Sequence, residues 1–101
     1  MTFDPLLPLK KINPELYETM NKSSKISFSE GKIPVKYKYL IAMALDAAHG
    51  ATDGVAALAQ QAIAAGATEE DIAEVLEVLH YVCGGGSIYT AANGLSGIVN
   101  R

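Results

Sequence analysis

Three side chains in this sequence could carry chemistry near neutral pH: His49, His80 and the single cysteine, Cys83. His80 precedes Cys83 by three residues, so the two would lie on the same side of a helix. An imidazolium beside a thiol favours the thiolate, which is the nucleophilic form. His80 and Cys83 are therefore the first candidates for nucleophilic or proton-transfer chemistry.

Cys83 also has a simpler interpretation, as a buried side chain of the core. It stands at the C-terminal end of a predicted helix, where the helix dipole disfavours a negative charge. A lone cysteine lacks the second thiol that a disulfide cycle needs, and free cysteine is among the most frequently buried residues. We therefore expect Cys83 to be packed in the core, so that a redox role would require pairing across a subunit interface.

The two histidines have structural alternatives as well. Histidine can move protons in a pocket, but His80 could instead bond a backbone carbonyl or lie at a subunit contact. His49 could cap the end of a helix, or pair with Asp46 or Asp53, which flank it in sequence. Neither HxxxH nor HExxH spacing occurs, so we expect no metal site and no cofactor.

The run Gly84-Gly85-Gly86 precedes a predicted helix, a position at which backbone N–H groups can bind an anion. The run lacks the lysine of a phosphate-binding loop, and no predicted strand precedes it. We expect a turn between helices, with Ser87 capping the helix that follows.

The chain is expected to be all-α, with about five helices in a single domain over residues 1–101. Apolar residues recur at three- and four-residue spacing, and no alternating strand pattern occurs. Caps at Asn13 and Thr68 begin two of the helices, the second with Asp71 in a capping box. The expected ranges are 14–28 with a weak stretch at 21–24, 34–48, 52–65, 68–82 and 87–95.

Two features concern packing. The alanine-rich ranges 34–48 and 52–65 should form a central helical hairpin, because alanine lets two backbones approach closely. Residues 1–13 should form an extended arm, since Pro5 and Pro8 oppose a regular helix. The apolar residues of this arm should pack on a neighbouring subunit or on its own bundle, and Leu16, Tyr17 and Met20 should point inward.

Composition points to self-association. The chain has 101 residues, is 50% hydrophobic and 19% charged, and has a mean hydropathy of +0.17. This is more apolar surface than a small monomer would easily cover. A tightly packed, alanine-rich helical bundle could account for it, but we expect a homo-oligomer that covers the excess at subunit contacts. The net charge of −3 gives no reason to expect nucleic acid or membrane partners. We expect a cytoplasmic protein, because the N-terminus is unlike a signal peptide and no disulfide framework is present.

The segment YKYLIAMALDAAHGATDGVAALAQQAIAAGATEEDIAEVLEV, from Tyr37 to Val78, resembles the carboxymuconolactone decarboxylase family, which includes alkylhydroperoxidase D-like proteins. The resemblance covers roughly the last two-thirds of the chain. It implies a helical bundle assembled into rings, with a hexamer as the implied oligomer. The stretch around His80 loosely matches a cavity-lining turn of the decarboxylase-like branch.

The redox branch of this family uses a glutamate, a CxxC pair and a histidine. With the register fixed on Gly66-Ala67-Thr68, these positions correspond to Tyr39, Ala51, Gly54 and Leu58 of this sequence. None carries the required group, so we expect no thiol peroxidase activity, and a peroxidase or disulfide reductase using Cys83 is the weakest hypothesis.

Two functions remain open from the sequence. The first is a thiol-independent, decarboxylase-like enzyme acting on a lactone or small organic acid, with His80 and His49 moving a proton. The alternative is a non-catalytic oligomeric member of the family that binds a ligand or a protein. Convergence of His80, His49 and Tyr89 on one closed cavity would favour the enzyme, and their dispersal over the surface would favour binding.

Overall fold

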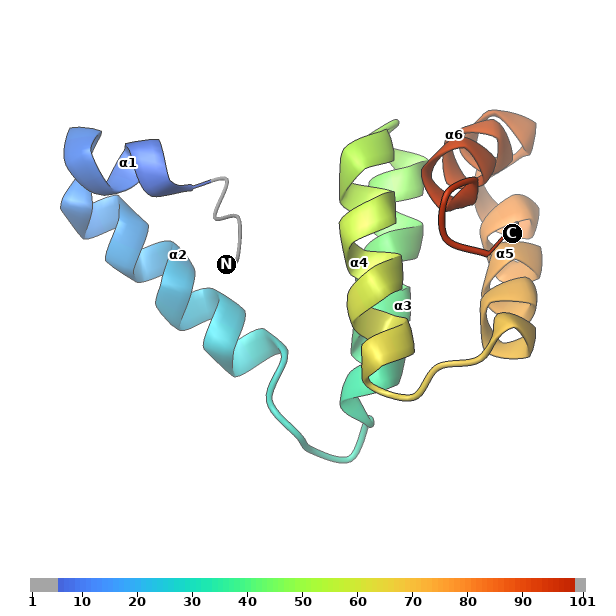
Figure 1. The fold of residues 1–101 in the computed structure, drawn as a ribbon, viewed down its shortest axis with the longest axis horizontal. Coiled ribbons are helices and arrows are strands. Elements are labelled where there is room, and N and C mark those ends of the chain that lie inside the picture. The colour runs from blue at the N-terminus through green and yellow to red at the C-terminus, as the bar shows by residue number, and fades with distance from the viewer. Residues whose placement is uncertain (1–5, 100–101) are drawn as a thin grey trace.

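The computed structural model describes residues 6–99 of the chain, and these residues form helices joined by turns (Figure 1). The predicted all-α fold is confirmed for residues 6–99. The helices are α1 (Leu7–Ile12), α2 (Pro14–Ser27), α3 (Val35–Ala48), α4 (Thr52–Ala64), α5 (Glu69–Cys83) and α6 (Gly85–Leu95).

Helices α3 to α6 form a bundle around one apolar core. The expected alanine-rich hairpin is its centre, because α3 and α4 pack along each other more extensively than any other pair of helices described. In Figure 1, α3 and α5 run in the same direction and α4 runs in the opposite one. The buried apolar residues are Leu40, Met43, Ala47, Val55, Ala59, Ala62, Ala67, Ile72, Leu79, Ala91 and Leu95.

Small residues allow α4 and α6 to approach closely. A Cβ atom placed on Gly94 of α6 would lie 2.5 Å from Val55 Cγ1 and 2.9 Å from the Thr52 carbonyl oxygen. Val55 is completely buried, so it has no free space into which it could move. Glycine at position 94 is therefore required by the packing of the two helices.

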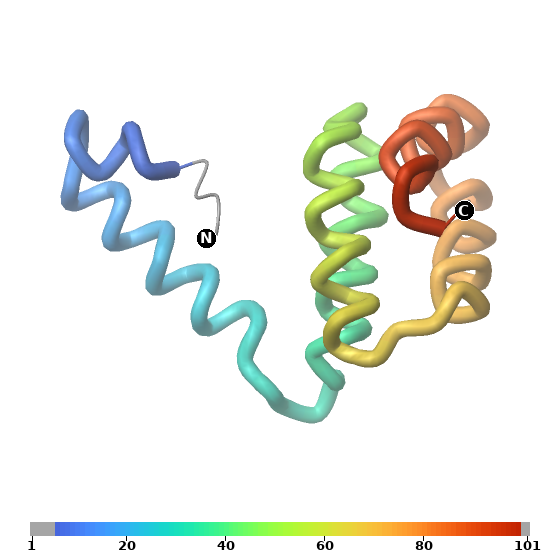
Figure 2. Tube along the Cα trace, viewed as in Figure 1, coloured from blue at the N-terminus to red at the C-terminus, as the bar shows by residue number. Residues whose placement is uncertain are grey.

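Helices α1 and α2 form an arm that extends away from the bundle (Figure 2). The two helices pack on each other, and neither contains a buried residue. The arm is joined to the bundle through residues 29–34. At this junction the Phe28 ring stacks on Tyr39 with 4.8 Å between ring centroids, and Lys38 Nζ donates a hydrogen bond of 2.7 Å to the Ser29 carbonyl.

The molecule is more extended than a closed monomer of its size. Its accessible surface is 7158 Å², whereas a folded monomer of 10.7 kDa is expected to expose about 5,500 Å². The radius of gyration is 14.3 Å, compared with about 13 Å for a compact domain of this length. A single chain therefore leaves uncovered surface that a compact domain would bury.

Some expectations about the first helices are wrong. Residues 1–13 were expected to be extended, but Leu7–Ile12 is helical because Pro8 lies in the first turn, where a missing N–H is tolerated; residues 1–5 lie outside the described part. Helix α2 starts as predicted, with Asn13 Oδ1 accepting from the Leu16 N–H, but it runs unbroken to Ser27. Leu16 and Met20 are exposed rather than turned inward.

The last turn also differs from its prediction. Gly84, with φ of +81°, separates α5 from α6, and Gly85 and Gly86 already belong to α6. Ser87 does not cap α6; its hydroxyl donates a hydrogen bond of 2.7 Å to the Gly84 carbonyl. Only one of the three glycines is needed to break the helix, because a single residue at positive φ is enough to redirect the chain.

Candidate functional site

An apolar hollow of the bundle lies between α3 and α5 and has a volume of about 340 Å³. We call it the α3–α5 groove. Its lining consists of aliphatic side chains and one thiol, and no charged side chain contributes. The lining residues are Ile41, Ala44, Leu45, Ala48, Val75, Val78, Leu79, Val82 and Cys83.

The helical repeat explains why these residues share one surface. Ile41 and Leu45 are four residues apart on α3, and Val78 and Val82 have the same spacing on α5, so each pair forms a stripe along its helix. The capping box fixes the start of α5: Thr68 Oγ1 accepts from the Asp71 N–H at 3.1 Å, and Asp71 Oδ2 accepts from the Thr68 N–H at 2.9 Å. The rotation of α5 that turns this stripe toward α3 follows from burial of Ile72 and Leu79 on its inner side.

The groove is open in the single chain. The exposed fractions are 50% for Ile41, 57% for Leu45, 65% for Val78 and 72% for Val82. Four large aliphatic side chains on one face, each at least half exposed, form an apolar patch typical of an interaction surface. A second apolar hollow shares Ile41 and Leu45 and extends the patch toward Ser27 and Phe28, where the arm leaves the bundle.

Cys83 lies at the end of the groove and is exposed. The expectation that it would be packed in the core is therefore wrong for the single chain. The helical repeat is the reason: Cys83 is four residues after the buried Leu79, but α5 ends at Cys83, and no further helical turn covers it. The thiol is thus the one lining side chain that could react.

The two histidines do not line the groove. His49 ends α3, where its Nδ1–H donates a hydrogen bond to the Leu45 carbonyl at 2.7 Å, so it acts as a cap for the last turn of α3. His80 lies on the exposed side of α5, and Tyr89 is 78% exposed on α6. His80, His49 and Tyr89 are therefore not enclosed together in the α3–α5 groove.

The four positions that the sequence resemblance assigns to the redox site have packing contacts or lie at a helix start in this fold. Tyr39 is partly buried under the Phe28 ring, and Leu58 packs against the core. Ala51 precedes α4 as its N-cap residue. Gly54 lies against the Asp46 side chain, which occupies the space that a Cβ atom would need.

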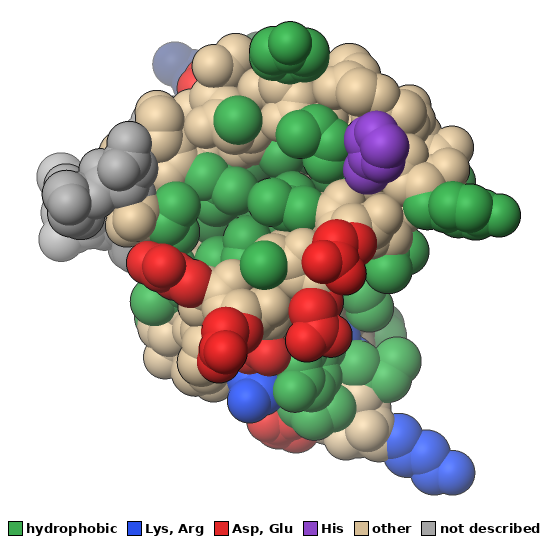
Figure 3. Space-filling view, turned by 90° about the vertical axis from the view of Figure 1, so that its right-hand side faces the viewer, with side chains coloured by type: hydrophobic (Ala, Val, Ile, Leu, Met, Phe, Trp, Pro, Cys, Tyr) green, Lys and Arg blue, Asp and Glu red, His purple; other side chains and the backbone are tan. Residues whose placement is uncertain are grey.

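Charge is distributed unevenly along the chain. All seven lysines lie between residues 10 and 38, and no lysine or arginine occurs from residue 39 to residue 99. Helix α5 carries five acidic residues, and Glu70, Glu74, Val78 and Val82 follow one another at four-residue spacing. Figure 3 shows the side of the molecule formed by α5 and α6, where acidic side chains lie next to a hollow with hydrophobic side chains.

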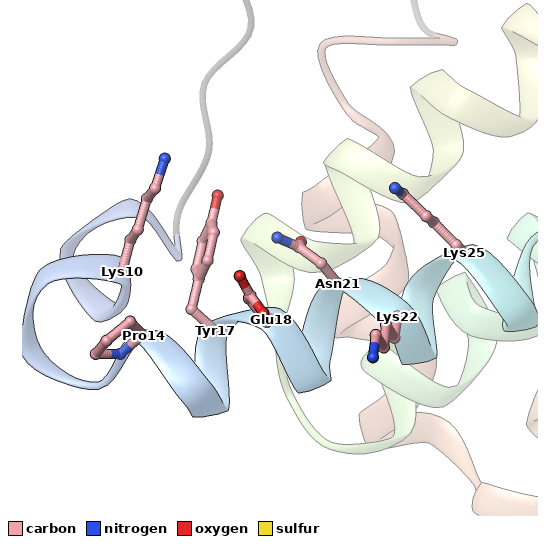
Figure 4. Close-up of a pocket in the computed structure, with 7 residues that line it drawn as sticks. All are labelled: Lys10, Pro14, Tyr17, Glu18, Asn21, Lys22 and Lys25. Atoms are coloured by element: carbon pink, nitrogen blue, oxygen red, sulfur yellow. The ribbon is translucent and has the colours of Figure 1, made fainter.

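A further hollow lies on the arm, with a volume of about 370 Å³. Figure 4 shows Tyr17, Asn21 and Lys25 extending from one side of α2, with Lys10 of α1 beside them. The Lys10 ammonium lies 5.9 Å from the Tyr17 ring centroid. This side of α2 is polar and basic.

Within residues 6–99, no three histidine, cysteine, aspartate or glutamate residues form a group that could hold a metal ion.

The fold is an all-α bundle with a projecting two-helix arm. A model of the carboxymuconolactone decarboxylase family matches residues 14–95, from the first residue of α2 to the last residue of α6. Because this match covers most of the sequence, the chain belongs to the carboxymuconolactone decarboxylase family. Comparisons with curated proteins and with solved structures returned no match.

Of the three candidates from the sequence, only Cys83 lines the groove, and the candidates did not include Ile41, Leu45, Val78 or Val82. Their four-residue spacing was visible, but spacing alone does not tell which side of a helix faces the core. None of the helices in residues 6–99 is long and apolar enough to cross a membrane.

Proposed function

We propose that this chain is a non-catalytic member of the carboxymuconolactone decarboxylase family that works as a homo-oligomeric binding protein, with the α3–α5 groove as the contact between subunits. The observation that carries this proposal is the exposure of Ile41, Leu45, Val78 and Val82 on one face. Covering such side chains stabilises an assembly, since each large aliphatic side chain contributes about 1.5–3 kcal/mol when its full surface is buried. The excess surface of the chain supports the same proposal.

The decarboxylase-like alternative has less support. Proton transfer to a bound lactone requires an acid or base within hydrogen-bond reach of the ligand, and neither histidine lines the groove. A small organic acid would also enter as an anion, and the nearest charged residues along α5 are acidic. A neutral lactone would meet the aliphatic lining without this repulsion, so the lactone is the better of the two candidate ligands.

Two measurements test this proposal: the mass of the protein in solution and its turnover of a lactone. Light scattering should give a mass of at least twice 10.7 kDa for the wild type, and Val78→Glu with Val82→Glu should lower it toward the monomer because two charges enter an apolar contact. Tyr89→Glu is the matched control, since Tyr89 is equally exposed but lies on α6. Monomeric wild type, or lactone turnover that depends on His80 or His49, would contradict the proposal.

The exposure of Cys83 at the groove favours one second candidate, a single-thiol reductase. In this reaction a peroxide would oxidise the thiolate to a sulfenic acid, releasing water or an alcohol. An external thiol would then form a mixed disulfide, and a second external thiol would release Cys83. Peroxide consumption by the wild type but not by Cys83→Ser would establish this function, and equal background rates would exclude it.

A further inference from the structure

We infer that α2 of a second copy occupies the α3–α5 groove, so that the arms are exchanged between subunits. The inference rests on the proposed function and names the segment that makes the subunit contact. For this contact to form, α2 must have an apolar face that its own bundle does not cover. The groove must be long enough to receive that face and opposite to the arm in charge, and the arm must be held away from the groove of its own chain.

Helix α2 has an apolar face without a partner in the bundle. Leu16 and Met20, four residues apart, are 43% and 40% exposed, and the other residues on this side are small hydroxyl side chains such as Ser23 and Ser27. Lys25 lies on the opposite side of the helix, because it follows Leu16 by nine residues, or two and a half turns. The helix thus presents one apolar face and one solvated basic face.

The groove is long enough for the two apolar side chains of α2. Its lining runs from Ile41 to Ala48 on α3 and from Val75 to Cys83 on α5, roughly 10–12 Å along each helix, and Leu16 and Met20 are about 6 Å apart along theirs. Laying the apolar face of one helix into the groove between two others is a common mode of recognition, and its anchors repeat at three- and four-residue spacing. Leu16 and Met20 have this spacing and could enter between the Ile41–Leu45 and Val78–Val82 stripes.

Charge favours the arm over a face-to-face contact. Residues 6–28 carry four lysines and two glutamates, whereas α5 carries five acidic residues and no lysine or arginine. Two α3–α5 faces placed against each other would bring two acidic α5 helices together, and like charges there oppose association. The arm of a second copy carries more lysines than glutamates, so its net positive charge is attracted to the acidic α5 even though Lys25 faces away from the groove.

The junction explains why the arm docks on a second copy. The Phe28–Tyr39 stack and the bond from Lys38 Nζ to the Ser29 carbonyl hold the arm in a direction that leads away from its own bundle. Phe28 also borders the hollow that contains Ile41 and Leu45, so the arm leaves its bundle beside the groove. Two copies related by a two-fold axis near this junction could each place α2 in the groove of the other.

Cys83 provides a direct test, because it is the only thiol in the chain and lines the groove. Met20→Cys with Cys83→Ser is mixed with wild type, oxidised with diamide, and the linked species are identified by intact mass. Any disulfide between the two chain types must join different copies. The matched control is Lys25→Cys with Cys83→Ser, which moves the thiol to the basic face of α2.

We expect the mixed disulfide to form at least tenfold faster with the Met20 variant than with the Lys25 variant. Equal rates in the two mixtures would overturn the inference, while an oligomer by light scattering would leave the proposed function standing. A disulfide within one chain in the single variant Met20→Cys, in a sample that scatters as a monomer, would show the arm in its own groove and overturn both. Circular dichroism of each variant confirms that the helices are retained.

Discussion

The solvent exposure of Cys83 would differ between a single chain and an assembly in which the groove is occupied. The thiol is exposed in one chain and lines the groove, yet the same position would be covered if α2 of a second copy occupied that groove. Reactivity of a thiol depends on its access as well as on its ionisation. Cys83 is therefore a native reporter of groove occupancy.

We predict that a thiol reagent labels Cys83 slowly in wild type and at least tenfold faster in Leu16→Glu with Met20→Glu. The two substitutions place charges on the apolar face of α2, so the arm should leave the groove and expose the thiol. Labelling is followed with a chromogenic disulfide reagent at a fixed protein concentration. Equally fast labelling of both proteins would mean that nothing covers the groove.

Gly94 is a residue at which the packing of α4 and α6 leaves no room for a side chain. We predict that Gly94→Ala lowers the free energy of unfolding by about 1–2 kcal/mol, because overpacking against Val55 and the Thr52 carbonyl outweighs the gain in helix propensity. Gly86→Ala is the control, since a Cβ there meets no atom within 4 Å, and it should be neutral or stabilising by up to about 1 kcal/mol. Urea unfolding at one protein concentration compares them, and equal effects would contradict the packing argument.

Among the helices, those with local start signals were the most predictable. Asn13 and the Thr68–Asp71 pair begin α2 and α5 as the sequence indicated, because each cap depends on residues within one turn. The direction in which Leu16 and Met20 point was not predictable, since it depends on which surface covers α2. The same limit applied to Cys83, whose burial was expected from the general tendency of free cysteine to be buried and not from its position at the end of α5.

The capping box gives a prediction for α5. Thr68→Ala removes the acceptor for the Asp71 N–H, and we expect a loss of about 1 kcal/mol in the free energy of unfolding. Thr90→Ala serves as a comparison, because the Thr90 hydroxyl only bonds the Gly86 carbonyl within its own helix and should change stability by less than about 0.5 kcal/mol. Identical unfolding curves for the two variants would show that the cap contributes nothing measurable.

The acidic edge of α5 gives a second prediction at this scale. Glu70→Lys with Glu74→Lys should weaken self-association by about three- to tenfold in Kd, because exposed charge pairs contribute roughly 0.2–1 kcal/mol each. The difference from wild type should shrink at 1 M salt, where charges are screened over about 3 Å. Sedimentation at low and high salt measures it, and tighter association of the variant would contradict the charge argument.

For the whole molecule, composition and structure both indicate that a single chain leaves surface uncovered. The sequence has more apolar residues than a small monomer would easily cover, and the folded chain exposes 7158 Å², well above the value of about 5,500 Å² for a monomer of this mass. The candidate site was less predictable than the fold. Its residues have no distinctive chemistry, and only the arrangement of α3 beside α5 brings them together.

The last prediction concerns coupling between assembly and folding. If subunits bury the α3–α5 groove, the unfolding midpoint of wild type should rise with protein concentration, because association stabilises only the folded chain. A tenfold increase in concentration corresponds to about 1.4 kcal/mol, and a domain of this size shifts by roughly 4–8 °C per kcal/mol. We therefore expect a rise of several degrees in wild type and in Tyr89→Glu, measured by calorimetry. In Val78→Glu with Val82→Glu the midpoint should be lower and independent of concentration. A concentration-independent midpoint in wild type would mean that the chain folds and works alone, with its groove open to solvent.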